Sequence, residues 1–131
     1  MDKTRKIWQK AKETATDKEA MKSTLTKAGN KLKSLAENSR ELRELKTKLE
    51  ILLRMFQSHI NGEYRAFPVS TIVLIVFALV YFITPTDLIP DFIPALGFTD
   101  DATVVLLIVK KLNRDIKKFY KWEDEQWEEA D

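Results

Sequence analysis

The sequence predicts an all-α protein built around one hydrophobic core. Its 131 residues suffice for one modest domain. Leucines recur at steps of three and four between residues 42 and 56, and an uncharged run of 17 residues follows at 67–83. We therefore expect a small helical protein with an apolar helical hairpin, joined by a Pro/Asp-rich turn and preceded by a long amphipathic helix.

Residues 1–40 are predicted to form a basic amphipathic helical extension with a thin apolar stripe. Gly29-Asn30 predicts a break, because glycine closes helices and asparagine caps the next one. Residues 1–50 carry a net charge of +6. We expect this arm to present a solvated face or to contact anionic lipid. Nucleic acid is disfavoured as a partner, because acids dilute the lysines and no aromatics alternate with them.

A helix is predicted from about residue 31 to residue 60, with a leucine-rich seam at heptad spacing. The sharp turn residues Asn61-Gly62 are expected to end it. The seam fits packing against neighbouring helices of the same chain, and it also fits a protein partner or a second copy of the chain. Its members are Leu42, Leu45, Leu49, Leu52 and Phe56.

The uncharged run at 67–83 is predicted to be helical, because a strand of this length would be anomalous. It lies at the lower limit of the lengths that span a bilayer. A tight transmembrane helix and a buried core helix are therefore both open.

Residues 84–101 contain three prolines, one glycine and four aspartates, which predicts that no regular helix runs through them. We expect Thr84 to cap a short turn with Pro85 at its first helical position, and Thr99 to cap the next helix, at about 100–120. Capping accounts for most of the aspartates. A weaker alternative is a site for magnesium or calcium, and another is the water-lined turn of an oligomeric channel or transporter. The candidate metal ligands are Asp87, Asp91, Asp100 and Asp101.

The segment from Tyr81 to Asp101 closely resembles the signature of the DUF1232, or YkvA-like, family, and the resemblance extends over residues 49–112. It indicates a domain at 41–121, followed by an acidic tail at 122–131. Members are mostly bacterial and are associated with membranes, and the family has no established reaction. The resemblance therefore implies a location and no mechanism. The family's motif positions fall on Pro85, Asp87, Pro90, Asp91, Pro94, Gly97, Asp100 and Asp101.

No motif of an enzyme is present. Cysteine is absent, which excludes disulfides and thiolate chemistry. His59 has no catalytic partner at a recognisable spacing, and it suits the end of a helix. No phosphate-binding loop or zinc-protease motif occurs. We therefore expect a protein without enzymatic activity or cofactor.

A second basic stretch follows the last apolar segment and mirrors the basic arm, which places both termini in the cytoplasm. The chain starts without the apolar run of a signal peptide, so the mature protein is expected to begin near Met1. The expected role is that of a membrane-associated scaffold, adaptor or envelope-related factor. The alternative is a soluble, cytoplasmic interaction module with a cation at the aspartates. The basic residues are Lys110, Lys111, Arg114, Lys117 and Lys118.

Overall fold

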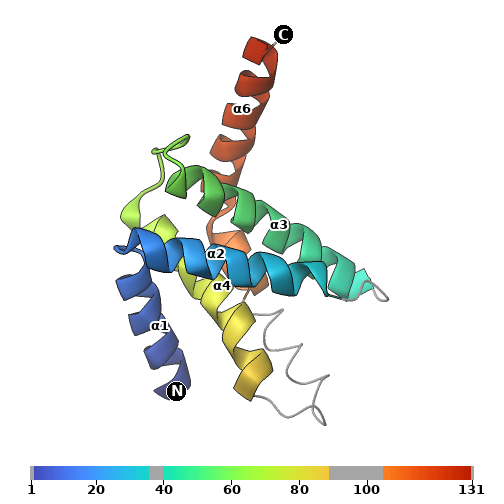
Figure 1. Cartoon of the computed structure of the whole chain (residues 1–131). Coiled ribbons are helices and arrows are strands. Elements are labelled where there is room, and N and C mark those ends of the chain that lie inside the picture. Colours follow the sequence, from blue (N-terminus) through green and yellow to red (C-terminus); the bar gives the residue numbers. More distant parts are fainter. Residues whose placement is uncertain (1, 36–39, 89–104, 131) are drawn as a thin grey trace.

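The computed structural model describes residues 2–35, 40–88 and 105–130, and within these ranges all regular structure is helical. The all-α prediction is thereby confirmed. A further helical stretch at 105–111 leads into the last helix. Figure 1 shows the arrangement of α1 (Asp2–Thr14), α2 (Lys18–Lys33), α3 (Arg40–Ile60), α4 (Val69–Leu88) and α6 (Asn113–Ala130).

Helix α4 lies at the centre, because α1, α2 and α3 all pack against it. Residues 69–83 carry no charge, and almost all side chains from Thr71 to Val80 are buried. Of the two alternatives for the apolar run, the structure has the buried core helix. In the part of the chain that the structure describes, no helix combines the length and the apolar character needed to cross a membrane.

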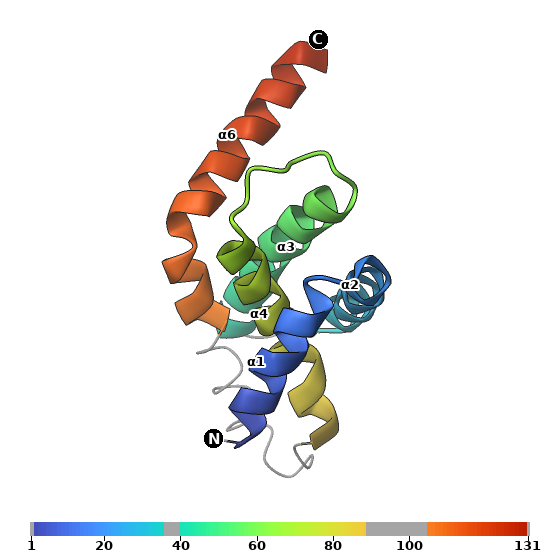
Figure 2. The same ribbon diagram turned by 90° about the vertical axis from the view of Figure 1, so that its left-hand side faces the viewer.

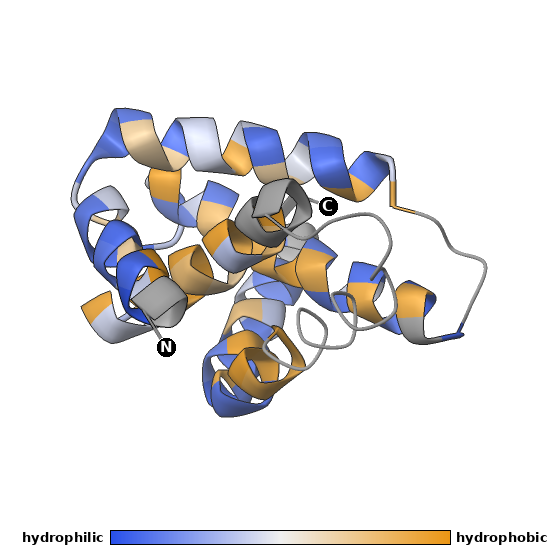
Figure 3. Cartoon of the chain, turned by 90° about the horizontal axis from the view of Figure 1, so that it is seen from below, coloured by the Kyte–Doolittle hydropathy of each residue, from blue (hydrophilic) through white to orange (hydrophobic). Residues whose placement is uncertain are grey.

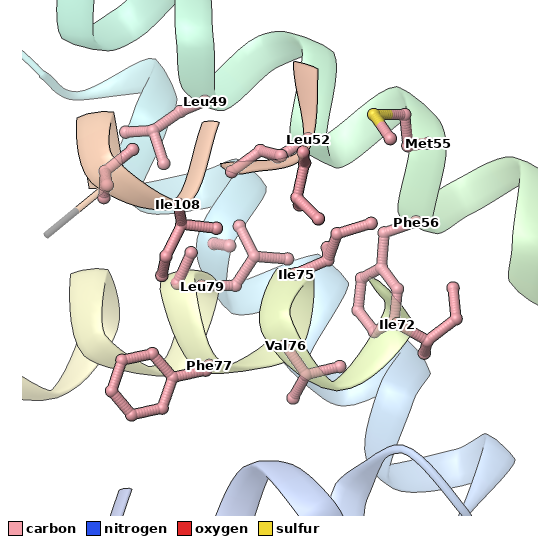
Figure 4. Close-up of a cluster of buried hydrophobic side chains, with 14 of the residues drawn as sticks. Leu49, Leu52, Met55, Phe56, Ile72, Ile75, Val76, Phe77, Leu79 and Ile108 are labelled. Carbon is pink, nitrogen blue, oxygen red and sulfur yellow. The ribbon is translucent and has the colours of Figure 1, made fainter. Parts of the chain in front are cut away.

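The core forms where the apolar faces of α3 and α4 meet. Figure 4 shows Leu49, Leu52 and Phe56 of α3 directed at the side chains of α4. On the other side of α4, Phe77 meets Trp8 of α1, with ring centroids 5.5 Å apart. Colouring by hydropathy shows the apolar residues gathered between the helices and polar residues on their outer sides (Figure 3).

The segment after residue 104 runs back along α4. Thr71, near the start of α4, hydrogen-bonds to Asp115, whereas Ile108 lies beside Leu79, further along α4 (Figure 4). The two stretches are therefore antiparallel. Backbone bonds from Leu112 to Ile108 and from Ile116 to Leu112, both 2.9 Å, carry the helical ladder across the junction at residue 112. The turn expected between them falls largely at 89–104, outside the described residues.

The N-terminal helices differ from the prediction. The expected break at Gly29-Asn30 is wrong, because α2 continues through both residues to Lys33. A glycine inside a helix costs only about 1 kcal/mol, which the burial of Ala28 and Leu32 on either side offsets. The break lies instead before Asp17, whose carboxylate accepts the amides of Glu19 and Ala20 at 3.0 and 3.2 Å.

The predicted stop after α3 is confirmed: Gly62 has a φ of +77°, in the left-handed region that favours glycine. The predicted end of the next helix is wrong, because α4 continues past Thr84 and Pro85 to Leu88. Thr84 therefore does not cap a new turn. Proline removes a single amide donor, and near the end of a 20-residue helix this loss is small.

Helix α6 lies along the other helices with its first half and extends beyond them with its second (Figure 2). An aromatic cluster attaches it to the loop after α3. Within this cluster the Tyr64 and Phe119 rings meet edge to face at 5.5 Å, and Trp122 stacks on Phe119 at the same distance. Arg54 of α3 adds a bidentate contact to Glu123, at 3.2 and 3.3 Å.

Truncation of a core residue on α4 tests this arrangement. Leu79 is fully buried, so Leu79→Ala leaves a cavity and should lower the free energy of unfolding by about 2–5 kcal/mol. The same change at Leu107, which is 62% exposed, should stay within about 0.5 kcal/mol. Urea unfolding followed by circular dichroism measures both. Equal losses for the two variants would contradict the central position of α4.

Candidate functional site

The aspartate-rich motif lies mostly outside the residues that the structure describes. This holds for Pro90, Asp91, Pro94, Gly97, Asp100 and Asp101. Pro85 and Asp87 lie on the helical backbone at the end of α4, and their side chains are likewise outside the described part. Elsewhere in the described ranges, no three His, Cys, Asp or Glu side chains form a group suited to a metal. The cation site at the four aspartates stays a prediction.

The side chain of Lys31 contacts α4 shortly before the residues of the motif. The Lys31 Nζ donates to the backbone carbonyl of Phe82, and it also lies 4.4 Å above the centre of the Phe82 ring. Lys31 therefore links α2 to the beginning of the motif.

Replacement of this lysine should loosen the end of α4. Lys31→Met keeps much of the apolar stem but removes the donor. Because hydrogen bonds to charged groups contribute about 1.5–3 kcal/mol, the unfolding free energy should fall by up to this amount. Lys27→Met, at an exposed position of the same helix, is the control and should have little effect. Equal stability of both variants in urea would show that the contact to Phe82 contributes nothing.

The leucine-rich seam of α3 is used inside the chain. Its first member, Leu42, is only partly covered, and the other four are fully buried. The intramolecular interpretation of the seam therefore describes this structure. A partner that contacted the buried members would first have to separate α3 from α2 and α4, and a partner at the seam stays a prediction. The buried members are Leu45, Leu49, Leu52 and Phe56.

His59 lies near the end of α3, as predicted, and is half-buried. Its Nδ1 is enclosed and has no hydrogen-bond partner. Burial, and secondarily the cation of Arg65, lower the pKa of His59 below its ordinary value of 6.5. The imidazole is therefore held neutral, which favours a structural role over proton transfer.

This environment makes stability depend on pH. Because the pKa of His59 is lower in the folded state, the unfolded chain takes up the proton more readily, and stability falls as the pH drops below 6.5. We expect His59→Gln to show a shallower decline in the free energy of unfolding between about pH 7 and about pH 5. Urea titrations across this range measure the difference. An identical decline in both proteins would contradict the assignment.

An open hollow of about 900 Å³ lies where the start of α4 meets the returning segment. One side is formed by the first residues of α4, including Ser70 and Thr71. Thr71 Oγ1 donates a 2.7 Å hydrogen bond to Asp115, which fixes the two sides together. Burial, and secondarily the charge of Asp115, raise the pKa of Tyr64. The other side carries five basic residues, Lys110, Lys111, Arg114, Lys117 and Lys118.

Three of the cations around the hollow are spaced so that they repel one another along the helix. Lys110, Arg114 and Lys118 succeed one another at intervals of four, so each faces a like charge one turn away. Such pairs destabilise a helix by about 0.2–0.5 kcal/mol each. All five basic side chains are exposed, and among the described residues none has an ion pair. The only carboxylate lining the hollow in the described part, Asp115, is held by Thr71.

This cationic surface, which we call the basic face, is suited to bind anions. The sequence indicated the basic stretch but not its position. What it missed is the hollow, because that depends on the start of α4 lying beside residues 110–118. The sequence predicted an antiparallel hairpin, which brings the two segments together. It does not determine which of their residues lie opposite each other.

Comparison with known proteins confirms the resemblance found in the sequence. Residues 71–107 match the family described as "Protein of unknown function (DUF1232)". A protein of Bacillus subtilis (strain 168) named "Uncharacterized membrane protein YkvA" is 38% identical over 69 residues. The match spans 53% of this chain and 65% of that protein's length. No solved structure matches significantly.

Proposed function

Because residues 71–107 carry the DUF1232 signature and a relative is named a membrane protein, we propose that this chain is a non-enzymatic helical protein attached to the cytoplasmic face of a membrane. Its role there would be that of a scaffold, an adaptor or an envelope-related factor. The membrane part of the proposal rests on the name of the relative. Since the match covers 65% of that protein, the activity of the whole relative is not transferred.

The buried state of α4 supports attachment at the surface over insertion. Its apolar side chains are already covered by α1, α2 and α3. To insert α4 into a bilayer, these helices would have to separate and expose their own apolar faces. Attachment through charged side chains on the outside leaves the core intact.

The absence of enzymatic activity is part of the same proposal. Its support is the environment of His59, whose pKa is lowered by burial and by Arg65. Its Nδ1 has no partner to orient the ring. A general base is normally oriented by a second group and lies within reach of a substrate.

A second candidate is a helical interaction module that does not bind membranes. The observation that favours it is the same burial of α4, because the apolar run then serves only as a protein core. The cation predicted at the aspartate-rich turn would belong to this candidate. Fractionation separates the two candidates.

The test is to express the full chain in a bacterial host and separate membranes from supernatant at low salt. We expect the protein in the membrane pellet and its release by alkaline carbonate without detergent. A pellet that only detergent dissolves would instead indicate an inserted hairpin. Recovery wholly in the supernatant would favour the second candidate and contradict the proposal. Centrifugation of purified protein without membranes controls for aggregation.

A further inference from the structure

The basic face needs a partner outside the chain. Five exposed cations line one side of the hollow, and three of them repel each other along the helix. Asp115 is the only carboxylate among the described residues that line the hollow, so the cations exceed it by four charges. Evolution of a stable helix alone would not favour such a cluster, because neutral or alternating side chains would serve better. The cluster therefore indicates a polyanionic partner.

Two exposed apolar side chains next to the hollow narrow the identity of that partner. Val69 is 76% exposed and stands between two residues that line the hollow, Pro68 and Ser70. Leu107 is 62% exposed and lies three and four positions before Lys110 and Lys111, which places it on their side of the helix. Aliphatic groups beside cations suit the boundary between lipid headgroups and acyl chains. They contribute nothing to the binding of a phosphate backbone in nucleic acid.

The charge distribution of α6 indicates how the molecule would be oriented on an anionic surface. Its first half carries Arg114, Lys117 and Lys118 of the basic face, whereas Asp124 and Glu125 follow in the second half, after Glu123, which pairs with Arg54. That half extends away from the other helices (Figure 2). The acidic end would be repelled from an anionic surface, and the basic face would be attracted to it. The charges thus favour one orientation of the molecule.

We propose that the basic face docks on an anionic phospholipid bilayer, with lipid phosphates in the hollow and Val69 and Leu107 in the headgroup layer. This inference rests on the proposed membrane attachment and names the surface responsible for it. The attachment is reversible and depends on ionic strength, because the attraction acts between exposed charges.

The experiment measures co-sedimentation of the full chain with vesicles of phosphatidylcholine alone or mixed with phosphatidylserine. The wild type should bind the mixed vesicles only, and less at high salt. In the triple variant Lys110→Gln, Arg114→Gln and Lys118→Gln, binding should weaken about a hundredfold, since each basic residue near an anionic surface contributes about fivefold. Circular dichroism should show an intact helical fold, because the changes remove like-charge repulsion.

A matched control removes the same charge elsewhere. Lys12→Gln, Lys18→Gln and Lys22→Gln change three exposed cations of α1 and α2, and this variant should retain most of the binding. An equal loss in both variants would show that net charge alone acts, which overturns the inference. Leu107→Gln, which keeps every charge, should weaken binding several-fold at high salt, and an unchanged affinity would remove the role of the aliphatic groups.

The outcomes separate the inference from the proposed function. If the wild type binds mixed vesicles and the triple variant binds equally well, the basic face is the wrong surface while membrane attachment stands. If the wild type binds no vesicle, the attachment itself fails. Binding to a duplex DNA oligonucleotide that is lost in the triple variant, without binding to vesicles, would assign the basic face to nucleic acid and overturn the inference.

Discussion

The fold depends on covering the apolar surface of α4. Residues 69–83 carry no charge and few polar side chains, and each large aliphatic residue left in water would cost about 1.5–3 kcal/mol. No single amphipathic helix can cover all sides of such a cylinder. The chain therefore surrounds α4 with α1, α2, α3 and the returning segment. The seam of α3 and the thin apolar stripes of α1 and α2 are the faces required for this purpose.

Once the apolar faces are directed inward, the charged faces remain outside, and their pattern is no longer determined by the core. Arg54 and Glu123 form a pair that joins α3 to α6, which is an intramolecular use of surface charge. The cations near residues 110–118 have no such use among the described residues. This contrast separates side chains that stabilise the fold from side chains that are available for a partner.

Sequence periodicity predicted the helices well and their boundaries less well. The seam of α3 and the stop at Gly62 followed directly from spacing and turn chemistry. Gly29 and Pro85 misled, because both residues disfavour a helix locally. The buried Ala28 and Leu32 keep α2 continuous through Gly29, and Pro85 removes only one amide near the end of α4. The basic residues of the candidate site were visible in the sequence. Their hollow was not, because it arises only when the start of α4 lies against Asp115.

The burial of α4 and the membrane name of the relative can be combined in one physical scheme. An apolar run that is already enclosed gains little by entering lipid, since the helices around it would lose their own buried contacts. Exposed cations near Val69 and Leu107 can reach an anionic surface without uncovering the core. In this proposed scheme the core supplies stability and the basic face supplies location. The strength of attachment is then set by ionic strength and lipid charge, while the fold stays unchanged.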